Sequence, residues 1–359
     1  MEAREPTFGA APAAAEAPTG GAESAGRWVE RAVAVATDRM LARFLALRPW
    51  YSEGWGDEGA IREILGLLER DFAPVMPAIT LRKGGWGGAY VQLVGELPSP
   101  APIAQHQPAS SRTARFELWL PRGKRTPAGV PMAVFLAATG EEGYASRRRL
   151  ALPLVASGIG ALILENPYYG SRRGPGQRGF VLPRLLDQVV MSGSTILEAI
   201  VLLQWLEAEG ASSIAVTGYS LGGFMSSTVA ALHQRPLAVI PVAAGASAAP
   251  GFLTGALRSA VAWGALPAAS RADAELRLSE LFTTVAATRL PLPLRPDAAI
   301  LVGATDDQIV PEAQVRALHA HWLGSELRWV RGGHAGGMLL GGPAVRLAIT
   351  DALRRLAAG

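Results

Sequence analysis

Short apolar runs alternate with helical patterns over most of this chain, and the alternation limits the fold more than any other feature. Eight runs have the length and composition of buried strands, at residues 90–94, 116–120, 132–137, 161–164, 214–216, 238–242, 299–302 and 327–330. Helical periodicity lies between most of the later runs, at residues 146–156, 185–209, 221–233, 312–323 and 344–356. Two early strands without an intervening helix, followed by strand–helix units, predict an α/β fold. We expect a mostly parallel eight-stranded sheet with helices on both faces.

Three segments fall outside the alternation. Residues 1–26 are rich in Ala, Pro and Gly and lack the uninterrupted apolar run of a signal peptide, so we expect a disordered tail. Residues 27–359 are expected to form one domain whose helical N-terminal part is 27–70, with helices at 27–47 and 58–70. Residues 251–296 are long, helix-prone and interrupted by prolines. This pattern predicts a cap, or lid, inserted over the carboxyl edge of the sheet.

The helix expected at residues 27–47 is amphipathic. Its apolar face comprises Val29, Val33, Ala36, Met40, Phe44 and Leu47. Such a stripe usually packs on the protein's own core, and we expect that arrangement here. Peripheral contact with a membrane surface is the alternative, although the polar face mixes both charge signs.

Composition excludes several classes of protein. The 359 residues include no cysteine, so disulfides and thiol nucleophiles are excluded. The net charge is only +4 and the arginines are spread along the chain, so nucleic-acid binding is not expected. No window of about eighteen apolar residues lacks a charge, which predicts no spanning helix and a cytoplasmic protein. We expect no cofactor and no metal, because His319 and His321 are two apart on a helix and point to different sides.

The segment GYSLGG at residues 218–223 matches the pattern G-x-S-x-G. In a chain with 41 glycines the pattern alone is weak evidence, so its surroundings decide. A buried strand precedes Ser220 and a helix follows it, which places this serine on a tight turn. Gly218 and Gly222 lack side chains that would clash there. The turn exposes the Ser220 hydroxyl as a nucleophile and places the Leu221 N–H at a helix start, where it would stabilise an oxyanion.

A serine nucleophile needs a base and an acid, and both are available later in the chain. His334 follows the last predicted strand within RGGHAGG, whose glycines let a loop reach over the sheet edge. Asp306 and Asp307 follow the strand at 299–302. We prefer Asp307, four residues before Pro311, and keep Asp306 as the alternative. The order Ser220, aspartate, His334 is typical of the α/β-hydrolase fold. A second oxyanion donor should come from the loop 137–143, and Thr139 is our candidate.

Three further segments carry a more specific likeness. They are YSEGWG at residues 51–56, ATGE at 138–141 with the later run Arg147-Arg148-Arg149, and LENPYYGSRR at 164–173. Together they resemble signatures of the alpha/beta-hydrolase domain-containing protein 18 family, and ENPYYG is the most discriminating piece. The likeness covers about residues 40–357, including the proposed nucleophile, acid and base. It implies a serine hydrolase, and animal members of the family are associated with mitochondrial phospholipid deacylation.

The segment 165–173 follows a strand, so we expect it at the same sheet edge as the nucleophile. Glu165, Tyr168 and Tyr169 are therefore candidates for substrate binding, as is Tyr219 beside the nucleophile. Aromatic rings and the arginines that follow would suit an anionic or amphiphilic substrate. The alternative is a purely structural loop in which Glu165 and Asn166 fix the backbone by hydrogen bonds.

These residues predict a serine hydrolase that cleaves a carboxylic ester, with an acyl group on Ser220 and with His334 as base and then acid. The expected partner is a small-molecule acyl ester or a lipid. An acyltransferase or thioesterase with the same triad is the alternative enzyme, and a non-catalytic binding protein of the same fold is the alternative outside enzymes. The many apolar residues of the cap, including Phe252 and Trp263, favour a pocket for a hydrophobic acyl chain over packing alone.

Overall fold

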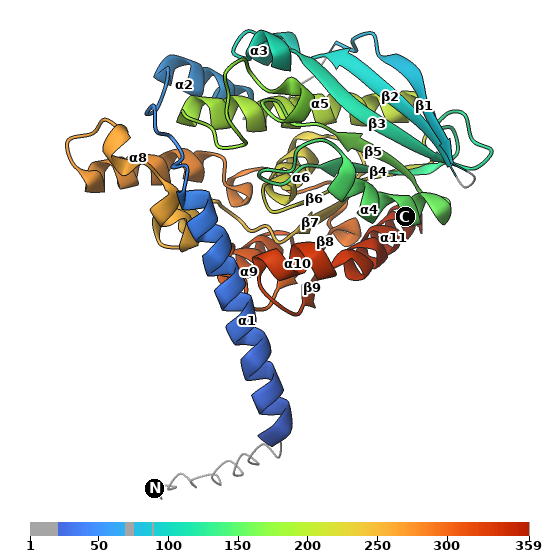
Figure 1. The fold of residues 1–359 in the computed structure, drawn as a ribbon. Helices are drawn as coiled ribbons and strands as arrows, with labels where there is room; N and C mark the ends of the chain where they lie inside the picture. The colour runs from blue at the N-terminus through green and yellow to red at the C-terminus, as the bar shows by residue number, and fades with distance from the viewer. Residues whose placement is uncertain (1–20, 69–74, 88–89, 359) are drawn as a thin grey trace, which may run out of the picture.

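The computed structural model describes residues 21–68, 75–87 and 90–358 (Figure 1). Nine strands in this part of the chain form one sheet in the order β1-β2-β3-β5-β4-β6-β7-β8-β9. The strands are β1 (Thr80–Gly87), β2 (Tyr90–Pro98), β3 (Thr113–Pro121), β4 (Pro131–Leu136), β5 (Gly160–Leu164), β6 (Ser213–Tyr219), β7 (Ala238–Val242), β8 (Ile300–Ala304) and β9 (Glu326–Val330). The six strands β4 to β9 pair in parallel, and β1, β2 and β3 extend the sheet in antiparallel fashion. The expected mostly parallel α/β sheet is confirmed.

The expected number of eight strands is wrong by one, because β1 was missed. Among the described strands, β1 pairs only with β2 and forms the edge of the sheet. Its sequence, TLRKGGWG, has no continuous apolar run, and Leu81 is exposed. The register shifts between Lys83 and Trp86, where two glycines pass close to the side chain of Gln92. An edge strand with a glycine pair need not be apolar, so hydrophobic periodicity gave no sign of it.

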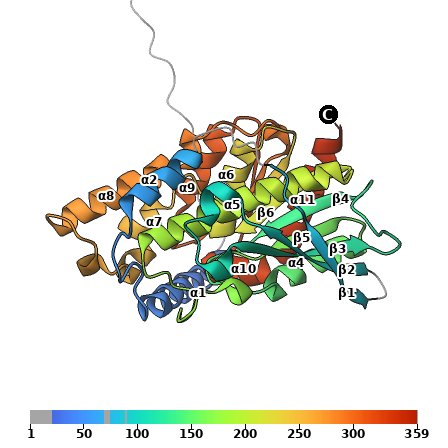
Figure 2. The same ribbon diagram turned by 90° about the horizontal axis from the view of Figure 1, so that it is seen from above.

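Helices cover both faces of the sheet (Figure 2). They are α1 (Gly21–Ala46), α2 (Glu58–Leu67), α3 (Ala101–Ala104), α4 (Ala145–Ala156), α5 (Leu185–Ala208), α6 (Leu221–Leu232), α7 (Ala249–Leu253), α8 (Arg271–Thr284), α9 (Glu312–His321), α10 (His334–Leu340) and α11 (Gly342–Ala358). Residues 69–70, where the second helix was expected to end, lie outside the described residues.

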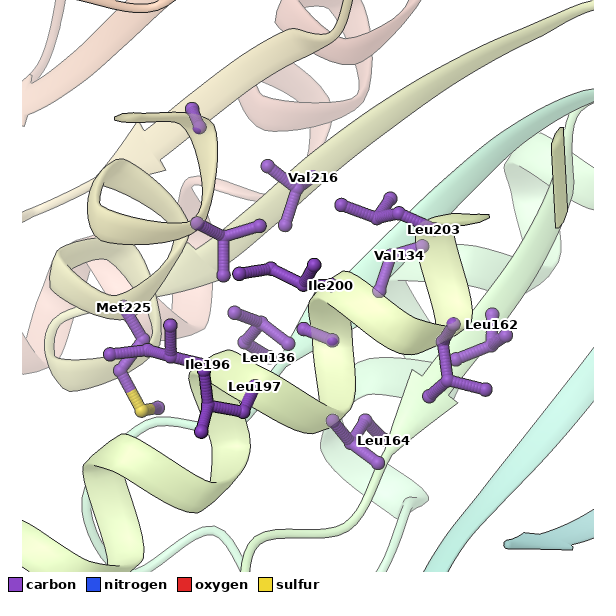
Figure 3. Close-up of a cluster of buried hydrophobic side chains, with 14 of the residues drawn as sticks. Val134, Leu136, Leu162, Leu164, Ile196, Leu197, Ile200, Leu203, Val216 and Met225 are labelled. Carbon is purple, nitrogen blue, oxygen red and sulfur yellow. The ribbon is translucent and has the colours of Figure 1, made fainter. Parts of the chain in front are cut away.

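The strand β4 shows how the two cores arise. Its residues Met132, Val134 and Leu136 join one cluster with α5 and α6, whereas Ala133 and Phe135 join another with α4 and α11. Alternate side chains of a strand point to opposite faces, so a strand buried on both sides reads as a continuous apolar run. Figure 3 shows the first cluster, in which side chains of α5 pack over the central strands.

The helix α5 is long and apolar enough to cross a membrane by length and composition. In this structure, however, 83% of its most apolar window is buried inside the protein. Its Glu198 is fully buried and forms an ion pair with Arg172. The helix therefore has the environment of a core helix, in the cluster that packs on one face of the sheet.

The first helix differs from expectation in its start. It begins at Gly21, inside the segment 1–26 that was expected to be a disordered tail. Residues 1–20 of that segment lie outside the described residues. The N-terminal part of α1 projects away from the body of the molecule (Figure 1).

The expected packing of the apolar stripe of α1 on the core is wrong. The side chains of Val29, Val33, Met40, Phe44 and Leu47 are between 56% and 76% exposed. The opposite side of the helix faces the protein and consists of Ala34, Asp38, Ala42 and Leu45. The small alanines allow α1 to approach the rest of the protein closely. The carboxylate of Asp38 can be buried because backbone N–H groups donate hydrogen bonds to it. The helix α1 therefore buries the face that contains Asp38, which is the opposite of the face that hydrophobicity alone predicted to be buried.

The segment between β7 and β8 is built mainly of helices, including α7, α8 and a 3-10 helix at Ala256–Ala260. Apolar side chains from it form a third cluster with the chain that follows α1, including Trp50, Phe252, Leu257 and Leu278. The backbone of Trp50 donates to Ala260 O at 2.7 Å, so the end of α1 is fastened to this segment. The residues expected to form a cap thus pack against the N-terminal helices and the chain that joins them.

Candidate active site

Ser220 lies on the sharp turn between β6 and α6. Its φ of 53° and ψ of −113° are rare for a residue with a side chain and store strain, as is common at functional turns. The Ser220 N–H donates to Val242 O at 2.8 Å, and the Phe224 N–H donates to Ser220 O at 2.9 Å. The turn is therefore held from the neighbouring strand and from the first turn of the helix.

Gly218 and Gly222 are required by close approach at this turn. A Cβ added to Gly218 would lie 2.4 Å from the carbonyl carbon of Gly222. A Cβ added to Gly222 would lie 2.4 Å from Leu136 O on β4. Both distances are far inside van der Waals contact, so larger residues would push the helix away from the sheet.

His334 connects Ser220 to Asp307. Its Nε2 lies 2.9 Å from Ser220 Oγ, and its Nδ1 lies 2.7 Å from Asp307 Oδ2. The other oxygen of Asp307 accepts the N–H groups of Ile309 at 2.8 Å and Val310 at 2.7 Å. The side chain of His334 is 8% exposed and that of Asp307 is 2% exposed, so the hydrogen bond between them is shielded from water. The structure thus brings Ser220, His334 and Asp307 into one hydrogen-bonded chain.

Asp306 points elsewhere. Its Oδ2 accepts the hydroxyl of Thr305 at 2.7 Å, and its Oδ1 lies 3.7 Å from Nε of Arg31 on α1. Of the two adjacent aspartates, only Asp307 has a hydrogen bond to the histidine. Asp307 is the aspartate that was preferred for its distance to Pro311, and its role as the acid stays a prediction.

The two expected oxyanion donors lie near the nucleophile. Leu221 is the first residue of the twelve-residue helix α6, so its N–H has no acceptor within the helix. Thr139 lines the same cavity as Ser220 and Leu221. The Ala138 N–H donates to Glu141 Oε2 at 2.8 Å, which fixes the backbone beside Thr139. Two amides in these positions could stabilise negative charge on an oxygen bound beside Ser220.

A largely apolar cavity opens at Ser220. Its lining comes from α5, from the chain after α1, from the loop after β8 and from the segment between β7 and β8. The apolar and aromatic lining includes Trp50, Val189, Phe252, Leu281, Phe282 and Val310. Phe252 stacks on Phe282, with ring centroids 5.2 Å apart, and lies 5.0 Å from the ring of Trp50. A few polar residues, among them Gln188 and Ser192, complete the lining.

The segment 165–173 does not line this cavity. Glu165 is 2% exposed, and its carboxylate accepts the N–H and the hydroxyl of Ser171. Tyr169 is 1% exposed and lies within hydrogen-bonding reach of the backbone of Gly140, next to Thr139. These contacts fix the loop itself and the loop of the second expected oxyanion donor. They favour the structural interpretation of the segment over direct substrate binding.

Tyr168 and the first arginine of the segment are also internal. Tyr168 is 7% exposed, and its N–H donates to Ser111 Oγ at 3.0 Å. Arg172 is fully buried and donates to both oxygens of Glu198, at 2.6 and 2.8 Å. Because this guanidinium is already paired, it is not available as an anion-binding group.

Tyr219 contacts the histidine instead of the cavity. Its hydroxyl donates to the carbonyl oxygen of His334, and the two rings meet edge to face with centroids 5.2 Å apart. Burial raises the pKa of Tyr219 well above its ordinary value, and the carboxylates of Asp307 and Asp38 raise it further. The phenol therefore stays protonated and supports the position of the histidine.

The sequence reasoning missed Asp38 on α1. Its Oδ2 accepts the N–H groups of Gln308 at 3.0 Å and His334 at 2.8 Å, and its Oδ1 accepts the Ala335 N–H at 2.9 Å. The residue is 0% exposed. Its partners lie 270 to 297 positions later in the chain, so no local motif reveals the contact. The one available signal was an acid between Ala34 and Ala42 on a helix.

Within the part of the chain that the structure describes, no group of three or more His, Asp or Glu side chains could hold a metal ion. The residues described above place a serine hydroxyl, an imidazole, a carboxylate and two backbone amides beside an apolar cavity. Such a set can perform acyl transfer by itself.

Comparison with known proteins gives one family and a common fold. The family model described as "Alpha/beta hydrolase domain containing 18" matches residues 48–277 and 267–355. An acetyl xylan esterase from Paenibacillus sp. R4 superposes with a TM-score of 0.57 at 15% identity, over 84% of this chain and 97% of that one. Acetyl xylan esterase 1 from Thermoanaerobacterium sp. JW/SL YS485 gives 0.56 at 16% identity, over 86% and 98%. At these identities the likeness concerns the fold, which is that of the α/β-hydrolases.

Proposed function

The chain belongs to the alpha/beta hydrolase domain containing 18 family, and on this premise we propose that it is a serine hydrolase cleaving a carboxylic ester. The observation that carries the proposal is the hydrogen-bonded chain from Ser220 through His334 to Asp307. Ser220 lies on a strained turn and lines the apolar cavity. A structural serine would not need a buried histidine and carboxylate aligned behind it.

The proposed reaction has two halves. In the first, Ser220 Oγ attacks the ester carbonyl carbon while His334 Nε2 takes the hydroxyl proton. The carbonyl oxygen becomes negatively charged and accepts hydrogen bonds from the N–H groups of Leu221 and Thr139. Collapse of the tetrahedral intermediate breaks the bond to the alcohol oxygen, and His334 returns the proton to the departing alcohol. Asp307 holds the imidazole in the required orientation and stabilises its charged form.

In the second half, a water molecule attacks the acyl group on Ser220. His334 takes a proton from this water, and the second tetrahedral intermediate collapses to release the carboxylic acid. The proton then returns to Ser220 Oγ, so the enzyme is restored. An acyltransferase would admit an alcohol in place of water, and a thioesterase would release a thiol in the first half.

The apolar cavity supports an ester with a hydrophobic acyl chain, such as a medium-chain or lipid ester. Aromatic and aliphatic side chains dominate its lining, and ligand cavities of this kind bind apolar groups with few polar contacts. Each methylene buried in such a cavity contributes about 0.8 kcal/mol to binding. The acyl chain is therefore expected to supply much of the binding energy.

The decisive test uses a fluorophosphonate probe and a p-nitrophenyl ester. Ser220→Ala should abolish both labelling and ester turnover while circular dichroism stays unchanged, because only the hydroxyl is lost. Ser227→Ala is the matched control, since this buried serine of α6 bonds its own helix at Gly223 O and does not line the cavity. It should retain labelling and turnover. Labelling of the Ser220→Ala protein at another serine would overturn the proposal, and an unlabelled wild type would indicate a binding protein.

A further inference from the structure

A single carboxylate on α1 holds together the two loops that carry the acid and the base. Asp38 accepts three backbone N–H groups, all between 2.8 and 3.0 Å. One belongs to Gln308, which directly follows Asp307. The other two belong to His334 itself and to Ala335. The contacts therefore join the loop after β8 to the loop after β9 through a side chain from the start of the chain.

The hydrogen bonds explain why a charged residue is buried on the inner face of α1. His334 and Ala335 are the first two residues of α10, and Gly333 before them has no side chain that could cap the helix. Their N–H groups have no acceptor within α10, so an acceptor from outside is needed. A polar side chain can be buried at little cost where backbone N–H groups satisfy its oxygens. Asp38 thus supplies the missing cap from a helix almost 300 residues earlier.

The geometry around Gly333 shows how closely the carboxylate approaches. A Cβ added to Gly333 would lie 2.7 Å from Asp38 Oδ2 and 2.9 Å from Oδ1. The backbone of Gly333, with φ −89° and ψ −174°, would itself accept an alanine. The three atoms nearest to such a Cβ all belong to Asp38, so the carboxyl group is the closest obstacle to a side chain here. On the other side of His334, the hydroxyl of Tyr219 holds the carbonyl oxygen.

We infer that Asp38 is a positioning residue for the proposed hydrolysis, setting His334 against Asp307 and Ser220. The inference rests on the proposed function. It also makes α1 part of the support of the active site, although the family match begins only at residue 48. A misplacement of about 1 Å at the histidine would lengthen both of its hydrogen bonds, and errors of that size can cost about 100-fold in rate. Substrate binding would change little, because Asp38 does not line the cavity.

The first experiment separates positioning from helix docking. We expect Asp38→Ala to lower kcat for a p-nitrophenyl ester by about 10- to 100-fold, with KM within about twofold and a parallel fall in the rate of probe labelling. Asp38→Asn keeps the size and one acceptor oxygen, so its loss should be smaller. Leu45→Ala is the matched control, because this buried residue on the same face of α1 lies outside the triad contacts. It should lower Tm and leave kcat unchanged.

The second experiment is a double-mutant cycle with Gly333→Ala. Alone, this substitution should lower kcat, because its methyl group displaces the histidine loop from Asp38. In the Asp38→Ala background the space is free, so the additional loss should be much smaller. Strictly additive effects, or Asp38 variants that lose Tm while keeping kcat, would overturn the inference. If Asp38→Ala does not fold, the Asp38→Asn and Gly333→Ala variants still decide it. Turnover surviving in Ser220→Ala would instead overturn the proposed function.

Discussion

Residues 306 and 307 are two adjacent carboxylates with different surroundings, and the difference bears on catalysis. Asp307 has one oxygen on the imidazole and the other on two backbone N–H groups. The carboxylate of Asp306 accepts the hydroxyl of Thr305 and lies 3.7 Å from Nε of Arg31. A group that fixes the tautomer of a catalytic histidine affects every turnover, whereas a neighbouring loop contact affects mainly local stability.

Exchanging each carboxylate for an amide tests this distinction. Asp307→Asn should lower kcat by about 10⁴-fold, because an amide donates to Nδ1 and favours the wrong tautomer of His334. Asp306→Asn should stay within several-fold of the wild type. Steady-state kinetics with one p-nitrophenyl ester, together with thermal unfolding of both variants, measures the two effects. The reverse ranking would show that Asp306 is the acid of the triad.

At the scale of elements, the cap distinguishes two aromatic residues that looked equivalent in the sequence. Phe252 on α7 lines the cavity and stacks on Phe282. Trp263 does not line it; the indole N–H donates to Arg258 O at 2.9 Å, and the guanidinium of Arg271 lies over the ring. The two residues belong to the same inserted segment, so a comparison between them separates acyl binding from packing of the cap.

Specificity constants for p-nitrophenyl esters should rise from acetate towards medium-chain esters, because each buried methylene adds binding energy until the cavity is full. Phe252→Ala should flatten this rise, since it removes a wall of the cavity. Trp263→Ala should leave the profile intact. Ratios between chain lengths are the appropriate measure, because Phe252→Ala also destabilises the fold by about 3–5 kcal/mol. A preference for acetate that neither substitution alters would leave the cap as packing alone.

The sequence pattern predicted best those elements whose structure depends on residues close together in the chain. The turn at Ser220 needs a strand, two glycines and a helix start, all within a few residues, and each was visible in the sequence. For the segment 165–173, the sequence left two interpretations open, substrate binding and a structural loop, for the opposite reason. Its aromatic and charged residues suggested a binding surface, but their partners, such as Ser111 and Glu198, come from distant parts of the chain. Hydrophobicity and spacing contain no information on such pairings.

At the scale of the whole molecule, α1 shows the same limit most clearly. Its sequence has two faces that could be buried, and the more hydrophobic one is exposed. The inner face is selected by the fit of small residues and by the hydrogen bonds of Asp38 to loops near the other end of the chain. A charged residue satisfied by backbone N–H groups can outweigh a larger apolar stripe, because burial of a polar group is costly only when it lacks partners.

Two N-terminal truncations, one that keeps Asp38 and one that removes it, should therefore differ in stability and in activity. Removing residues 1–26 takes away the segment preceding Arg27, and Ala34 is the first buried residue among 26–46. We expect the Tm of this variant to lie within a few degrees of that of the full chain. Its turnover should lie within about twofold. Removing residues 1–47 also deletes Asp38 and Leu45, so the triad loops lose their shared acceptor and the cap loses a packing partner. Tm should then fall by more than a few degrees and kcat by at least the amount lost in Asp38→Ala. Full activity in the shorter chain, measured by thermal unfolding and ester turnover, would show that α1 supports neither the fold nor the active site.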